Sequence, residues 1–204
     1  MWKRDTDSNS MTAMDMFALV ALEFMVIAII LFFFIGLKHP AEQSKQQGNV
    51  IVELYWNDAY NTDVDLWVKA PHDIPVGYSN KGGRLFNLLR DDLGKNKTDV
   101  SGKNMEIATS RGILAGEYII NAHLFRLGDG KLPLPIKAVV SVKAHDDDSA
   151  QQLFSVDTKL YRECQEKTLI RFWLDSKGNL DPDSVNSVQQ NLRNGRSCTD
   201  RGSP

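Results

Sequence analysis

The sequence has few cysteines, no excess of basic residues and none of the common catalytic motifs. Its 24 Lys and Arg are outnumbered by 26 Asp and Glu, so the chain lacks a basic footprint for DNA or RNA and no nucleic-acid partner is expected. Gly-x-Ser-x-Gly, His-Glu-x-x-His, a P-loop and a Cys/His nucleophile arrangement are all missing. We therefore expect neither enzymatic activity nor a cofactor.

One long apolar segment lies near the N-terminus. Residues 16–37 are apolar except for Glu23, and a helix of this length is about 33 Å long, close to the roughly 30 Å core of a bilayer. The run is longer than the apolar core of a cleaved signal peptide and leads into the polar stretch "KHPAEQSKQQGN". The sequence predicts a retained transmembrane helix over 12–38, preceded by a cytoplasmic N-terminus, 1–11.

The two cysteines indicate the orientation of the chain in the membrane. The basic residues do not indicate it, because lysine or arginine residues flank the apolar segment on both sides. Cys164 and Cys198 both follow the helix, and an isolated pair fits a disulfide in an oxidising compartment. The bridge would close a loop of about 34 residues and contribute roughly 3–4 kcal/mol. We expect a single-pass protein of the bacterial inner membrane with its body in the periplasm; two unpaired thiols are the alternative.

The rest of the chain has the pattern of short strands separated by turns. After a linker at 39–49, alternating or β-branched segments predict strands at 49–56, 64–70, 117–126, 136–144 and 168–175. Short helices are predicted at 87–94 and 183–195. The predicted fold is a single N-terminal transmembrane α-helix plus an all-β antiparallel sandwich, 50–175, followed by a C-terminal extension, 176–204, tethered by the disulfide.

Glu23 is the most unusual residue of the apolar segment, because an ionised carboxylate at the bilayer centre costs roughly 2.5–3.5 kcal/mol. The pattern "ALVALEFMVIAIILFFF" within residues 12–37 resembles the transmembrane helix of the ExbD/TolR family and, more distantly, of flagellar stator B-subunits such as MotB. The resemblance implies that Glu23, where the family usually has Asp, relays protons or sodium. It also implies a homodimer inside a pentameric ring of multi-pass ExbB/TolQ/MotA-like subunits, which would shield Glu23 from lipid.

Two structural alternatives accompany this interpretation. Glu23 in its protonated form could merely pair two helices by a hydrogen bond. Asp15, a candidate secondary intramembrane acid, follows Thr12 by three residues, a spacing typical of a capping box at a helix entrance. We favour the capping role for Asp15.

The segment after the linker has a second resemblance. "ELYWNDAYNTDVDLWVKAP", "VGYSNKGGRLFNLLRDDLG" and "LAGEYIINAHLF" are similar to YfaP-like β-sandwich domains of bacterial envelope proteins over about residues 50–126. The resemblance implies a sandwich fold and brings no catalytic activity.

The predicted sandwich carries oxygen donors of the kind that calcium prefers. They lack the spacing of an EF-hand loop, and the alternative is that they cap turns through backbone N–H groups. These residues are Asp63, Asp65, Asp91 and Asp92, with Asn57 and Asn80.

Aromatic and histidine residues give weaker signals. The aromatic set could form a glycan surface but is more typical of a sandwich core. "HDDD" at 145–148 fits a solvated loop, and nothing identifies His72 or His123 as a ligand or base. The aromatic set is Trp56, Tyr60, Trp67 and Tyr78.

The sequence thus favours a B-type subunit of an ion-driven motor, with a periplasmic domain that couples to an envelope or cell-wall partner. The alternative is a membrane-anchored β-sandwich that binds glycan, peptide or protein without ion transport.

Overall fold

The computed structural model describes residues 6–36, 49–94, 102–143 and 149–193 of the chain, and within the first range the side chains of 15–30. The chain divides into two compact units, residues 1–45 and 46–204. The first contains the helix α1, Thr6–Gly36. Because α1 begins at Thr6, Thr12 and Asp15 lie inside it, and the predicted capping box at the helix entrance is wrong.

Between Met16 and Ile30 the described surface of α1 is apolar on every side except for Glu23. All side chains described in it, residues 15–30, are exposed, and they include Phe17 at 76% and Phe24 at 70%. A search of the described residues finds no helix with both the length and the hydropathy of a membrane span.

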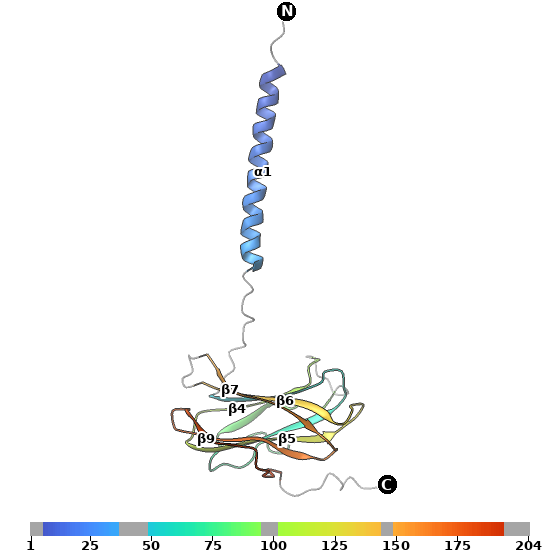
Figure 1. Cartoon of the computed structure of the whole chain (residues 1–204), viewed down its shortest axis with the longest axis vertical. Coiled ribbons are helices and arrows are strands. Elements are labelled where there is room, and N and C mark those ends of the chain that lie inside the picture. The colour runs from blue at the N-terminus through green and yellow to red at the C-terminus, as the bar shows by residue number, and fades with distance from the viewer. Residues whose placement is uncertain (1–5, 37–48, 95–101, 144–148, 194–204) are drawn as a thin grey trace, which may run out of the picture. The chain divides into compact units, whose positions relative to one another are not determined.

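The second unit consists of two antiparallel sheets, as the alternating segments predicted (Figure 1). One sheet has the strand order β3-β4-β1-β6-β7 and the other β2-β5-β8-β9. The strands are β1 Val50–Trp56, β2 Asp63–Lys69, β3 Phe86–Arg90, β4 Met105–Ser110, β5 Gly116–Arg126, β6 Leu134–Val142, β7 Gln151–Leu160, β8 Glu166–Leu174 and β9 Leu180–Asn186.

Aromatic rings cross the main core from one sheet to the other. Phe86 of β3 packs edge-on against Tyr118 of β5, with ring centroids 6.2 Å apart. Tyr118 stacks on Phe172 of β8 at 5.5 Å, and Phe172 contacts Phe154 of β7 at 5.1 Å. Since β3 and β7 belong to one sheet and β5 and β8 to the other, these rings hold the two layers together.

Both short helices predicted in this unit are wrong. Residues 86–90 form β3, an edge strand paired with β4, and residues 91–94 continue as irregular chain. Within the predicted helix at 183–195, residues up to Asn186 belong to β9 and the described remainder is irregular. Tertiary pairing at the sheet edges overrides local propensity at both places.

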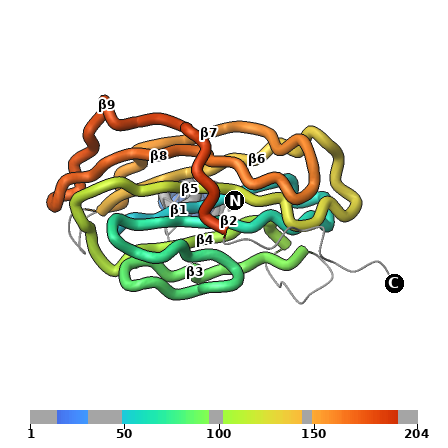
Figure 2. The backbone as a smooth tube through the Cα atoms, turned by 90° about the horizontal axis from the view of Figure 1, so that it is seen from below, coloured from blue at the N-terminus to red at the C-terminus, as the bar shows by residue number. Residues whose placement is uncertain are grey.

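The chain after β9 covers part of the outer face of the sheet that contains β2 and β5. Figure 2 shows it turning back across β5 toward β2. Leu192, only 3% exposed, packs against Trp67 of β2 and Ile119 of β5. Asn121 of β5 donates a hydrogen bond to the carbonyl of Gln190 at 2.8 Å. Residues 187–193, within the predicted extension 176–204, are therefore packed on the sheet.

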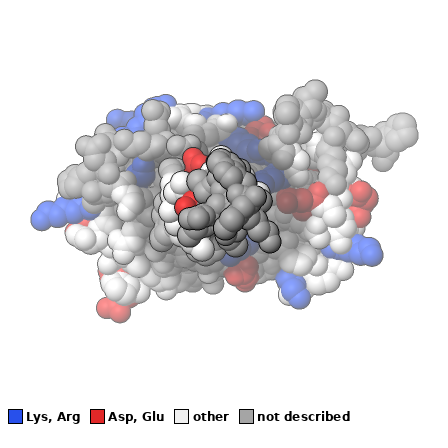
Figure 3. All heavy atoms as spheres, turned by 90° about the horizontal axis from the view of Figure 1, so that it is seen from above, with Lys and Arg blue, Asp and Glu red and all other residues white. Residues whose placement is uncertain are grey.

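Charges on the β unit are mixed. In the view of Figure 3, basic and acidic side chains of the described residues are interspersed around the edge of the face shown. Among the described residues visible at this edge, the basic side chains do not form a continuous surface of the kind that binds nucleic acid.

Candidate functional site

A cluster of carboxylates lies where the edge strand β2 of one sheet meets β3 and β4 of the other. Asp65 of β2, Asp91 after β3 and Glu106 of β4 each place an oxygen atom within 4.8 Å of the others. Asp65 is 2% and Glu106 0% exposed, and the Asp91 side chain is 11% exposed. The sequence prediction included Asp65 and Asp91 but missed Glu106.

Glu106 is fixed by backbone donors from two directions. Its Oε2 accepts a hydrogen bond of 2.6 Å from the Leu66 amide, and its Oε1 accepts one of 3.3 Å from the Asp92 amide. Because β2 is an edge strand, none of the described strands lies on that side to accept a hydrogen bond from the Leu66 amide. Glu106 thus satisfies a donor that would otherwise be buried and unpaired.

Asp65 is held by a histidine and, through it, by an arginine. Asp65 Oδ2 lies 2.7 Å from His123 Nδ1, and Arg193 Nη1 lies 2.6 Å from His123 Nε2. An arginine can only donate, so Nε2 is the acceptor and the His123 proton is on Nδ1, directed at Asp65. His123 is completely buried, and nothing in the sequence pattern identified its role.

Asp91 and Asp92 are adjacent but differ in role. Asp92 accepts hydrogen bonds from the amides of Gly94 at 2.9 Å and Met105 at 3.2 Å. It therefore binds backbone N–H groups, as the alternative to a metal ligand predicted. Asp91 Oδ2 forms an ion pair of 2.7 Å with Lys81, whose side chain is 58% exposed. The other oxygen of Asp91, Oδ1, is buried and has no hydrogen-bond partner among the described residues.

Asp63 is a further buried acid beside the cluster. It is 4% exposed, and its Oδ1 has no hydrogen-bond partner within the described part of the chain. Asp63 and Asp65 are separated by one residue in β2, so their side chains share a face of the strand.

Burial makes the charged forms of these groups unfavourable. Burial raises the pKa of Asp65 to about 8; burial, with the charge of Asp65, raises that of Asp63 to about 7. Burial likewise raises the pKa of Glu106 well above its usual value. The pKa of His123 falls to about 4, because burial and then the Arg193 charge oppose its protonation.

These shifts predict that, without divalent cations, the β unit loses stability as the pH rises from 6.5 to 8. In this range the folded state retains protons on Asp63 and Asp65 that the unfolded state has already released, so the free energy of unfolding falls with pH, by roughly 2 kcal/mol. His123 acts in the opposite direction, but only between about pH 4, its folded pKa, and about 6.5, its unfolded value.

The free energy of unfolding is measured at pH 6.5 and 8 by urea unfolding of the full chain in mild detergent with a chelator. Tryptophan fluorescence follows the transition. Asp65→Asn should have a shallower dependence, because it removes one titrating group but keeps an acceptor for His123. A free energy of unfolding that stays constant or rises over this range would contradict the prediction.

The two asparagines predicted beside the acids are engaged in turns. Asn57 Oδ1 accepts a hydrogen bond from the Ala59 amide at 2.8 Å, and Asn80 Nδ2 donates one to the Pro75 carbonyl at 2.8 Å. Among the predicted aromatic residues, Trp56 is buried and its indole donates to the Thr62 carbonyl at 3.0 Å. His72 is exposed, and 145–148 lies outside the described residues.

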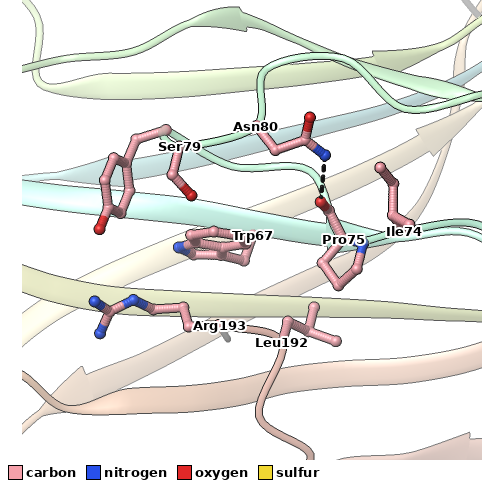
Figure 4. Close-up of a pocket in the computed structure, with 8 residues that line it drawn as sticks. Trp67, Ile74, Pro75, Ser79, Asn80, Leu192 and Arg193 are labelled. Atoms are coloured by element: carbon pink, nitrogen blue, oxygen red, sulfur yellow. Dashed lines mark hydrogen bonds between the residues drawn. The ribbon is translucent and has the colours of Figure 1, made fainter. Parts of the chain in front are cut away.

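A groove opens beside the cluster on the outer face of β2 (Figure 4). Its volume is about 550 Å³, and Figure 4 shows Trp67 between Arg193 on one side and Ser79 and Asn80 on the other. Trp67 is packed edge-on against Tyr78, with ring centroids 5.6 Å apart. A Cβ atom added to Gly77 would approach the Trp67 ring to 2.5 Å. Two of the predicted aromatic residues, Trp67 and Tyr78, therefore line this groove, and Arg193 connects it to His123 and Asp65.

The remaining predicted residues lie in other places. Glu23 and Asp15 are exposed on α1. Cys164, which follows β7 in the chain, is in a disulfide; the other cysteine of the sequence, Cys198, lies outside the described residues, so the predicted pairing stays a prediction.

Comparisons of the chain with protein-family models, with curated proteins and with solved structures yield no match.

Proposed function

We propose that this chain is a B-type subunit of an inner-membrane ion-driven motor, similar to the ExbD/TolR family, in which Glu23 relays protons or sodium. The observation that carries the proposal is the surface of α1. Between Met16 and Ile30 its described side chains are exposed and apolar on every side, except for the single carboxyl of Glu23. A helix that is apolar all round is covered by lipid or protein in its working state.

The anchor itself is proposed from the sequence. The apolar run covers residues 16–37, of which the described side chains extend to Ile30, and a span requires about 20 apolar residues. An acid inside such a span is a functional candidate by default, because its cost must be offset. A ring of multi-pass partner subunits around two copies of the helix would offset this cost, because it would keep Glu23 away from lipid.

The disulfide at Cys164 supports an oxidising compartment for the β unit, which in a bacterium is the periplasm. In this proposal the N-terminus is cytoplasmic, and the β-sandwich engages an envelope or cell-wall partner. Ion flow past Glu23 supplies about 2.3 kcal/mol per charge for each 100 mV of membrane potential. That energy would move the helix pair relative to its ring, and the sandwich would transmit the movement.

A second candidate, a membrane-anchored binding module without ion transport, is favoured by the groove of the β unit. Trp67, Tyr78 and Arg193 combine aromatic faces with a cation in a concave site, a combination suited to glycan or peptide.

Substitution of Glu23 separates the two candidates. The wild-type chain and the variants Glu23→Gln and Glu23→Asp are each extracted from native membranes in mild detergent. Native mass spectrometry of one portion gives the mass of each complex. A second portion is reconstituted into liposomes that contain a pH-sensitive or sodium-sensitive dye. For a motor subunit we expect two copies with a multi-pass ring in all three, and ion flux in Glu23→Gln reduced to that of empty liposomes, because an amide cannot exchange a proton.

Glu23→Asp is the matched control: it keeps the carboxyl and should keep flux. Recovery of a chain without a multi-pass partner, with no flux in the wild type and no effect of the substitutions, would reject the motor and leave the anchored binding module.

A further inference from the structure

The carboxylate cluster belongs to the β unit, and the role proposed for it does not rest on Glu23. We propose that Asp65, Asp91 and Glu106 bind a divalent cation of the size and hardness of calcium, with Asp63 as a neighbouring oxygen donor. The first support is geometric: one oxygen from each of the three residues lies within 4.8 Å of the others. Oxygens that each stand 2.3–2.6 Å from one calcium ion are separated by no more than about 5 Å.

The second support is a pair of buried acceptors that lack donors. Asp63 is 4% exposed, and its Oδ1 and Asp91 Oδ1 have no hydrogen-bond partner among the described residues. Asp63 lies beside the cluster because it shares a face of β2 with Asp65, and the charges of Asp65 and Asp91 act on its carboxyl. Unpaired buried carboxylate oxygens are costly; a cation held by the cluster would give Asp91 a partner and would place a compensating charge near Asp63.

Basic side chains approach the cluster from its surroundings. Lys81 pairs with Asp91 from an exposed position, and Arg193 is bonded to His123, which in turn is bonded to Asp65. The charge of Arg126 acts on Asp63. Within the described part of the chain, the hydrogen-bond donors to Glu106 are the backbone amides of Leu66 and Asp92, and no basic side chain bonds to it. A central divalent ion supplies the missing positive charge.

The donor set selects the kind of ion. It consists of carboxylate oxygens, whereas both ring nitrogens of His123 are already hydrogen-bonded, so the nitrogen and sulfur ligands that favour zinc are lacking. Magnesium usually retains several water molecules, which suits a buried site less well than calcium does. A bound ion would connect β2 of one sheet to β4 and the end of β3 of the other.

The test uses the full chain in mild detergent, stripped of metal with a chelator. Terbium serves as a luminescent probe for calcium, excited through tryptophan; Trp67 is two residues from Asp65. We expect saturable terbium luminescence at one ion per chain, displaced by calcium below about 1 mM and by magnesium only at higher concentration. Calcium should also raise the melting temperature of the β unit, because it binds the folded state.

Two ligand variants and two controls locate the ion. Asp91→Asn and Glu106→Gln should each weaken calcium binding at least about tenfold. Lys81→Gln removes the ion pair but no ligand, so it should bind calcium at least as tightly as the wild type. Asp157→Asn changes an exposed acid of β7 and should have no effect. Circular dichroism in the absence of metal verifies that each variant is folded. If Glu106→Gln does not fold, the comparison of calcium binding by Asp91→Asn and Lys81→Gln still tests the proposal.

Absence of saturable binding up to about 1 mM calcium would overturn the proposal. Equal binding by Asp91→Asn and the wild type would also overturn it, because the ion would then be held by other acids of the chain. Tighter binding of zinc than of calcium at the same residues would overturn the assignment of the ion.

Discussion

Tyr118→Ala is expected to lower the free energy of unfolding of the β unit by roughly 3–5 kcal/mol, the range for removal of a fully buried aromatic ring. Tyr118 is 0% exposed and occupies the middle of the aromatic row, between Phe86 at 6.2 Å and Phe172 at 5.5 Å. Its removal leaves a cavity between the two sheets and separates the rings that connect them. Urea unfolding of the full chain in detergent, followed by tryptophan fluorescence, measures the loss.

Tyr118→Phe is the matched control. The Tyr118 hydroxyl accepts a hydrogen bond from the Leu114 amide and donates one to the Leu114 carbonyl, both at 2.9 Å. The phenylalanine keeps the ring and loses only these bonds, at a cost of about 1 kcal/mol. Equal losses in the two variants would show that the hydroxyl, and not the stacked ring, carries the stabilisation.

The strands that the sequence predicted share one property: they bury a regular set of side chains. Val64, Leu66 and Val68 of β2 enter the main core, and β1, β5, β6 and β8 show similar alternation or continuous burial. The missed strand β7 begins with two exposed glutamines, and β9 is largely exposed. Both lie at sheet edges, where long-range pairing forms the strand and the sequence pattern carries little signal.

The candidate site was predictable only in part for a related reason. Asp63, Asp65 and Asp91 stand in short segments rich in acids, which a search for oxygen ligands detects. Glu106 lies 41 residues beyond Asp65, in a strand that was not predicted, and joins the cluster only because the edges of the two sheets meet there. Tertiary structure, which a single sequence does not display, makes that contact.

His123 did carry a local signal. It interrupts the apolar stretch of β5, where its neighbours Ala122 and Leu124 are fully buried. A polar residue inside such a strand is expected to have a buried partner, but the identity of the partner came from the structure. Arg193 lay in a segment predicted to be helical, so its contact with His123 could not be anticipated.

The largest effect expected at the site itself is that of His123→Ala. This change should lower the free energy of unfolding by roughly 3–5 kcal/mol, because it combines a buried cavity with the loss of two hydrogen bonds. Asp65 would lose the donor at 2.7 Å, and Arg193 would lose the acceptor at 2.6 Å. Since Arg193 lines the groove, loss of its hydrogen bond to His123 should also loosen residues 187–193 against β5.

His123→Phe separates the two contributions. The phenylalanine fills most of the space of the imidazole but cannot bond to Asp65 or Arg193, so it should lose only the hydrogen-bond part, roughly 1–3 kcal/mol. Denaturant unfolding gives both values, and hydrogen exchange of the Leu192 amide, which donates to Glu166 at 2.6 Å, reports on the segment. Faster exchange in both variants is expected. Wild-type exchange in His123→Phe would contradict a role of the Arg193–His123–Asp65 chain in holding the segment, because a ring of similar size would then suffice.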